Sequence, residues 1–338
     1  MGLISFTNRG IYCQQGDFYI DPWLPVDYAV TTHGHADHVR WGNKYYLCHH
    51  LTKAIIKCRI SEDLIVESLG YGETITRNGV QISFHPAGHV IGSAQVRLAY
   101  KGEVCVLSGD YKTEYDGIST AFEPVKCHTF VSESTFGLPI YNWLPQETIF
   151  QDINQWADQN REEHKTTVLI AYSLGKAQRL MQNLAGHSAI YVHRSIARLN
   201  AAIQQAGVSL PSYTEISAET GKDELQAGIL IVPPAMRDTK WIKSLHTAAV
   251  GVCSGWMQVR SHRRWQSADA GFALSDHADW NGLIDAIRAT EAEKIYVTHG
   301  FTSVFARYLT EQGLDAEAVS TQFGVEDDER IEEKEVNI

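Results

Sequence analysis

The chain has 338 residues, 44% of them hydrophobic and 20% charged, and a formal net charge of −11. This composition is typical of a globular protein with one large or two moderate domains, and the negative charge argues against a generic polyanion-binding surface. No run of about 18 apolar residues is present, so we expect no membrane span. The N-terminus shows no export signal and the six cysteines are scattered, which predicts a reduced, cytoplasmic protein.

The first third of the sequence is typical of β-structure. Short apolar or β-branched runs end at turn residues, as strands do. One of these runs, residues 28–31, leads directly into a histidine-rich loop. The other strands are expected at residues 10–13, 18–20, 80–85, 94–98, 104–108 and 130–132.

The middle of the chain has a different pattern, because helical periodicity alternates with short apolar strands. This alternation predicts a parallel α/β unit. The last part repeats it, with a helix at 280–289, a strand at 294–297 and a helix at 304–312. In the middle, helices are expected at 146–163, 176–185 and 196–205, and strands at 167–171, 190–192 and 229–232.

The most informative stretch is the loop after residues 28–31. It reads Thr-His-Gly-His-Ala-Asp-His over residues 32–38 and so holds three histidines and one aspartate. Imidazole and carboxylate are the ligands of hydrolytic zinc and manganese centres. Because an ordinary exposed loop does not need four side chains of this type, the pattern predicts a metal site.

More residues of ligand type recur where predicted strands end. A rigid sheet aims such side chains, and the following loop leaves them accessible. Each one alone is weak, because a lone histidine is more often structural and a Gly-Asp pair is usually a turn. Together with the loop they indicate one site. These residues are Asp21, His89, Asp110, Glu133, His277 and His299.

The set is large enough for two divalent metal ions, either zinc or manganese. Two ions about 3.5–4 Å apart can share a hydroxide and stabilise the entering and leaving oxygens of an in-line displacement. We expect Asp110 to be shared between them. The remaining ligands are expected to be His33, His35 and His89 for one ion, and Asp37, His38 and His299 for the other.

Four residues are expected to have catalytic roles. Asp37 binds a metal ion, and Asp21 fixes the tautomer of a ligand imidazole by accepting its hydrogen bond. An acid must protonate the leaving oxygen, and His277 is the candidate. Glu133 is expected to orient His277 and to hold its proton.

In this order, the residues resemble the motifs of the metallo-β-lactamase superfamily. Asp21, the cluster at 33–38, His89 and Asp110 match its first four motifs. The later segments are similar to motifs A, B and C of the β-CASP nucleases. These segments are Ser-Glu-Ser-Thr-Phe-Gly at 132–137, Ser-Asp-His-Ala-Asp at 275–279 and Val-Thr-His-Gly at 297–300.

The resemblance implies an α/β protein with a metallo-β-lactamase αββα sandwich, interrupted by a small α/β domain of the β-CASP type. The sandwich domain is expected to comprise residues 1–145 and 253–338, and the inserted domain residues 146–252. The chain departs from the family at residues 232–236, Val-Pro-Pro-Ala-Met, where relatives often have a glycine.

In overall layout the chain resembles bacterial exonucleases associated with ATP-dependent DNA ligase in DNA-damage-response gene clusters. The resemblance implies a metal-dependent DNA exonuclease, acting 5′ to 3′ in DNA repair, with the ligase and a helicase as partners. His299 favours an alternative, an RNA-processing endo- or exoribonuclease of the same fold, since histidine in motif C is typical of RNA-processing members. A small-molecule hydrolase or an inactive scaffold is disfavoured by Glu133 and His277.

The helix start at residues 173–179 resembles one that is common in β-CASP domains. Family members that trim ends usually prefer a 5′-phosphate, and Ser173, Lys176, Arg179 and Ser254 are candidates for binding it. The alternative, which we favour, is a capped helix with a solvated basic face.

Overall fold

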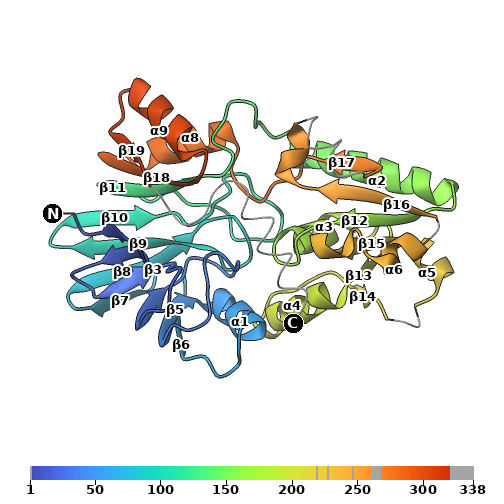
Figure 1. Ribbon diagram of the computed structural model, residues 1–338, viewed down its shortest axis with the longest axis horizontal. Coiled ribbons are helices and arrows are strands. Elements are labelled where there is room, and N and C mark those ends of the chain that lie inside the picture. The colour runs from blue at the N-terminus through green and yellow to red at the C-terminus, as the bar shows by residue number, and fades with distance from the viewer. Residues whose placement is uncertain (1, 218–219, 227, 246, 260–267, 320–338) are drawn as a thin grey trace. The chain divides into compact units, whose positions relative to one another are not determined.

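The computed structural model describes residues 2–217, 220–226, 228–245, 247–259 and 268–319, which are drawn in colour in Figure 1. They form two compact units. Unit 1 holds the described parts of residues 2–115, 119–139 and 277–319, and unit 2 holds those of 116–118 and 140–276. Within the described ranges, no helix combines the length and the hydropathy that crossing a membrane requires.

Unit 1 contains two mixed sheets. The first has the strand order β1-β2-β3-β4-β5-β6, and the second has the order β19-β18-β11-β10-β9-β8-β7. The first sheet consists of β1 (Ser5–Thr7), β2 (Gly10–Cys13), β3 (Phe18–Ile20), β4 (Tyr28–Val30), β5 (Tyr45–His49) and β6 (Val66–Leu69). The second consists of β7 (Thr74–Arg77), β8 (Val80–Pro86), β9 (Ala94–Tyr100), β10 (Glu103–Leu107), β11 (Thr129–Ser134), β18 (Lys294–Gly300) and β19 (Ala316–Ala318).

The two sheets of unit 1 pack face to face with helices on their outer faces. Val30 and Leu47 from the first sheet share one core with Phe84 and Val96 from the second. Helices α8 (Trp280–Ala289) and α9 (Thr302–Glu311) cover the other face of the second sheet, and α1 (His50–Arg59) covers that of the first (Figure 1). The predicted αββα sandwich is therefore confirmed, and its strands alternate apolar residues toward the shared core.

Unit 2 is a doubly covered parallel sheet in the order β14-β13-β15-β12-β16-β17. Helices α2, α3 and α4 pack on one face, and α5 and α6 pack on the other. Because both faces are covered, the central strands are apolar throughout. The elements are α2 (Gln146–Glu162), β12 (Thr166–Ile170), α3 (Lys176–Leu184), β13 (Ala189–Val192), α4 (Arg194–Gln205), β14 (Thr214–Glu215), α5 (Lys222–Gln226), β15 (Gly228–Val232), α6 (Lys240–Ser244), β16 (Ala248–Cys253) and β17 (Ala270–Phe272).

Unit 2 continues to residue 276, whereas the inserted domain was expected to end at residue 252. The difference has a structural reason. β17 pairs in parallel with β16 from Gly251 to Cys253, so the segment after β16 adds an edge strand to the same sheet. The motif-B histidine, His277, is thus the first residue of the returning part of unit 1.

Candidate metal centre

The predicted site residues of unit 1 lie where its strands end. Asp21 follows β3, the loop with His33 to His38 follows β4, and Asp110 follows β10. Neighbouring strands β3 and β4 are parallel, as are β10, β11 and β18, so their carboxyl ends point the same way. The sheet pairing therefore collects side chains that are far apart in the sequence.

A first group of possible ligands consists of His33, His35, His89 and Asp110. Nδ1 of His35 lies 3.1 Å from Nε2 of His33 and 3.1 Å from Nε2 of His89. Oδ2 of Asp110 lies 3.6 Å and 3.8 Å from these two Nε2 atoms. Nitrogens that surround a zinc ion at about 2.0–2.1 Å are separated by about 3.3–3.4 Å in a tetrahedron, which is close to this spacing.

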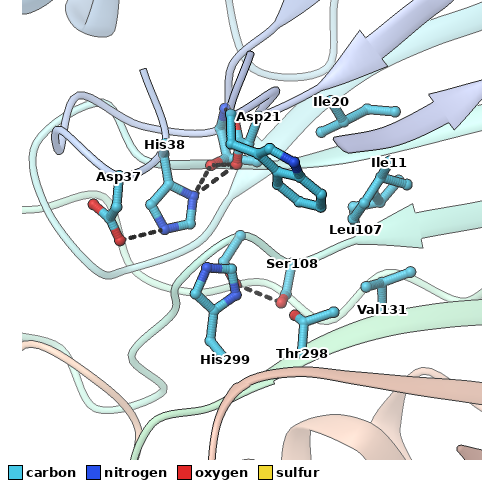
Figure 2. A pocket seen from close by; sticks show the side chains of 13 residues that line it. Ile11, Ile20, Asp21, Asp37, His38, Leu107, Ser108, Val131, Thr298 and His299 are labelled. Carbon is cyan, nitrogen blue, oxygen red and sulfur yellow. Dashed lines mark hydrogen bonds and ion pairs between the residues drawn. The ribbon is translucent and has the colours of Figure 1, made fainter. Parts of the chain in front are cut away.

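A second group consists of Asp37, His38 and His299. Nε2 of His38 lies 3.2 Å from Oδ2 of Asp37 and 3.2 Å from Oδ2 of Asp110. The rings of His38 and His299 stack with their centroids 5.1 Å apart, and Figure 2 shows both beside Asp37. Asp110 is thus next to both groups, as expected for a shared ligand.

The buried polar atoms of this site fit divalent cations. Among the described residues, Oδ1 of Asp110 is buried without a hydrogen bond, and Nε2 of His38 is buried beside two carboxylate oxygens. Unpaired buried oxygens and clustered carboxylates are costly, and a cation would offset this cost. The donor set, imidazole with carboxylate, suits zinc and manganese alike.

The protonation of the site is consistent with this use. Burial lowers the pKa of His33 well below its ordinary value, so the ring is neutral and able to bind a metal. Burial opposes charge on His38 as well, but the carboxylates of Asp110 and Asp37 outweigh it and raise the pKa of His38. The same histidine holds the pKa of Asp110 well below its ordinary value despite burial. In the absence of cations, His38 therefore takes up a proton that a metal ion would displace.

Asp21 fixes His38 from the side opposite Nε2. Its Oδ2 lies 2.7 Å from Nδ1 of His38, and its Oδ1 accepts a hydrogen bond of 2.9 Å from the backbone of Thr32. These contacts place the Nδ1 proton on the Asp21 side and leave Nε2 facing Asp37, as Figure 2 shows. Asp21 and His299 both have left-handed backbone conformations, with φ of 42° and 53°. Such strain is common at functional sites.

Glu133, which is buried, and His277, which is partly exposed, form a pair next to Asp110. Nδ1 of His277 lies 2.9 Å and 3.1 Å from the two carboxylate oxygens of Glu133, which is 1% exposed. Glu133 also accepts a hydrogen bond of 2.7 Å from the backbone of Tyr111. The same carboxylate therefore orients His277 and anchors the loop that carries Asp110.

Sequence reasoning missed two threonines that support the site. The hydroxyl of Thr32 donates to Asp21, and that of Thr135 donates to Glu133. Thr32 lies directly before His33, and Thr135 lies two residues after Glu133. Their places inside the motifs were the available signal, but the pattern did not show which carboxylate each one would reach.

The prediction of a solvated basic face on α3 is wrong. Lys176 is 4% exposed and Arg179 is 1% exposed, and both form ion pairs with Asp276. Of the two serines considered with them, Ser173 shares a hydrogen bond with Ser195, and Ser254 caps a short 3-10 helix at residues 255–258. The basic side chains are buried because the segment before His277 packs against α3 within unit 2.

The layered sandwich and the His/Asp groups at its strand ends are features that the chain shares with the metallo-β-lactamase superfamily. With the inserted α/β unit, the Glu133–His277 pair and the relatives described below, the chain is similar to the β-CASP group of that superfamily. No protein-family model matches the sequence.

Three curated proteins illustrate the relationship. The chain is 29% identical to a "Probable DNA ligase" of Opitutus terrae over 92% of its own length and 30% of that protein. It is 28% identical to "Endoribonuclease YSH1" of Saccharomyces cerevisiae over 36% of the chain and 16% of that protein. It is 24% identical to an "RNase J-like protein" of Methanocaldococcus jannaschii over 46% of the chain and 42% of that protein. The chain thus spans less than half of each of these relatives.

The fold also has a counterpart among solved structures. A crystal structure of a protein of unknown function from Enterococcus faecalis V583 matches 87% of this chain and 79% of its own, with a TM-score of 0.57. The sequence identity is 10%, so the likeness concerns the fold alone.

Proposed function

We propose that this chain is a metal-dependent phosphodiesterase that degrades DNA from its ends, 5′ to 3′, during DNA repair. The observation that supports this most is the position of Asp110 between two groups of imidazole and carboxylate ligands, with the Glu133–His277 pair beside it. A pair of divalent ions, zinc or manganese, would supply an activated water and charge neutralisation at phosphorus.

The protein's own side chains do the rest of the chemistry. His33, His35, His89 and Asp110 would hold one ion, and Asp37, His38 and His299, with Asp110 close by, would hold the other. Nδ1 of His277 donates to Glu133, so Nε2 is the atom that delivers a proton to the leaving oxygen. Glu133 fixes the tautomer of this imidazole, while Asp21 keeps His38 directed at the second group of ligands.

DNA is the proposed substrate because of the relative that matches over nearly the whole chain. That relative is named a probable DNA ligase, and a nuclease that trims ends would prepare DNA for joining. We therefore propose an ATP-dependent DNA ligase and a helicase as partners in the cytoplasm. The second candidate is an RNA-processing nuclease, supported by the relatives named as endoribonuclease and RNase J-like protein and by His299 in motif C.

The test is a digest by the purified protein with manganese or zinc. Matched DNA and RNA oligonucleotides carry a label at either the 5′ or the 3′ end, and Asp110→Asn serves as the control. Early release of a labelled mononucleotide from the 5′ end of DNA is expected. Release from the 3′ end alone would overturn the polarity, and preference for RNA would establish the second candidate. If the protein binds about two metal ions but releases label from none of the substrates, nuclease activity is refuted.

A further inference from the structure

Unit 2 contains a buried charge cluster directly before His277. Lys176 and Arg179 lie on the first turns of α3, and both contact the carboxylate of Asp276. Nζ of Lys176 is 3.3 Å from Oδ2, and Nη1 of Arg179 is 3.3 Å from Oδ1. All three residues are at most 4% exposed. Two cations therefore share one carboxylate in the interior of unit 2.

Arg179 is fixed more firmly than an ion pair requires. Its Nη1 also donates to the carbonyl of Ser275 at 2.5 Å, and its Nε donates to the side chain of Gln146 at 2.7 Å. A planar guanidinium with donors in a fixed arrangement holds several acceptors at once, which a lysine cannot do. The backbone of Ser275 and the side chain of Asp276 are thus held by one arginine.

The chain on the other side of His277 is held as well. The backbone N–H of Ala278 donates to the carbonyl of Tyr111 at 2.7 Å, within unit 1. His277 is thus joined by peptide bonds to Asp276, which is held within unit 2, and to Ala278, which is held within unit 1. Because a buried cation is costly, two cations placed on one carboxylate call for a reason beyond stability.

We propose that Lys176, Arg179 and Asp276 are positioning residues for His277, because they hold the two residues that directly precede it in the chain. This inference rests on the proposed function. The three side chains fix the backbone from which His277 projects, while Glu133 fixes its ring. A shift of about 1 Å in a reacting group can cost on the order of 100-fold in rate.

The test compares two substrates that differ in their need for an acid. An oligonucleotide linkage releases an alkoxide, which needs a proton, whereas a p-nitrophenyl phosphodiester releases p-nitrophenolate, which leaves without one. Arg179→Lys keeps the charge but cannot span Ser275, Asp276 and Gln146. It is expected to lower kcat on the oligonucleotide about tenfold or more and to change the p-nitrophenyl rate by less than about twofold. His277→Ala should show the same difference between the two substrates, and KM should be unchanged in both variants.

Two further variants keep the test decisive. Lys176→Met leaves the pair between Arg179 and Asp276 in place and should give a smaller split. Arg161→Gln is the matched control, because this arginine pairs with Asp158 on the surface of unit 2. Thermal melts and metal content should match the wild type in any variant that is compared, and Lys176→Met decides the matter if Arg179→Lys does not fold.

The outcomes are separable from those of the proposed function. An equal decrease in kcat on both substrates, or no decrease on either, would refute the positioning role. A rise in KM confined to 5′-phosphorylated oligonucleotides would refute it too, because it would show that α3 binds phosphate. If the wild type cleaves neither substrate, the proposed function fails; if it cleaves both without a split in the variants, only this inference fails.

Discussion

Replacing Asp21 by asparagine should weaken metal binding by the second group of ligands, which contains His38, and leave metal binding by the first group unchanged. Asp21 does not lie among the metal ligands, but its Oδ2 is 2.7 Å from Nδ1 of His38. Its backbone has φ of 42°, a left-handed conformation that asparagine also adopts readily. The Asp21→Asn variant therefore removes the negative charge behind His38 and leaves the local fold in place.

The size of the effect follows from that one contact. A hydrogen bond to a charged group contributes about 1.5–3 kcal/mol, and the neutral amide oxygen retains about half of it. The remaining loss of about 0.8–1.5 kcal/mol corresponds to about a 4–13-fold weaker metal affinity. This is within the range of about 10–100-fold seen when a partner behind a metal-bound histidine is removed, or just below it.

The assay is a calorimetric titration of metal-free protein with manganese or zinc. Asp17→Asn is the matched control, since Asp17 also has a left-handed backbone, with φ of 55°, but contacts only Tyr12 among the hydrogen bonds found for its side chain. One of two binding steps should weaken in Asp21→Asn and neither in Asp17→Asn. Unchanged affinity in both steps would show that Asp21 does not support His38, and weakening of the first group alone would show that the two groups are wrongly assigned.

Three more outcomes are expected. His277→Ala should reduce turnover on nucleic acid about 10²–10⁴-fold with two metal ions still bound; the loss of an ion would make His277 a ligand instead. Gly109→Ala should lower metal affinity about tenfold or more, because Gly109 has φ of +56° and an added Cβ would lie 2.6 Å from Thr32; normal affinity would contradict this. Burial lowers the pKa of His49 to about 4, so its neutral form stabilises the fold above the unfolded pKa near 6.5, and that stability is lost as the pH falls toward 4. Denaturant melts of the metal-free protein give the free energy of unfolding at pH 7 and at pH 4.5. Between these pH values, His49→Asn, which keeps a cap for α1, should lose about 1–2 kcal/mol less of this free energy than the wild type. An equal decrease in both proteins would refute the reasoning.

Local patterns predicted most of the scaffold. The strands around residues 10–13, 18–20 and 28–30 and the helix–strand alternation of unit 2 are present, since their apolar spacing is set by the periods of strands and helices. The sequence did not reveal β5, α1, β6 and β7. These elements are short and mix polar with apolar residues, and their stability comes from packing in the sandwich.

The sequence by itself determined which residues are available for the chemistry, because histidine and aspartate in H-x-H-x-D-H spacing serve few other purposes. It also placed Asp110 and His299 directly at strand ends. Only the tertiary structure decided which of them meet. Glu133 and His277 are 144 residues apart and pair only because β11 and the start of the returning segment come together in unit 1. Likewise, the sequence predicted that Lys176 and Arg179 lie on the surface, whereas in the structure both are buried and pair with Asp276. Burial depends on what packs over a helix and not on the helix itself.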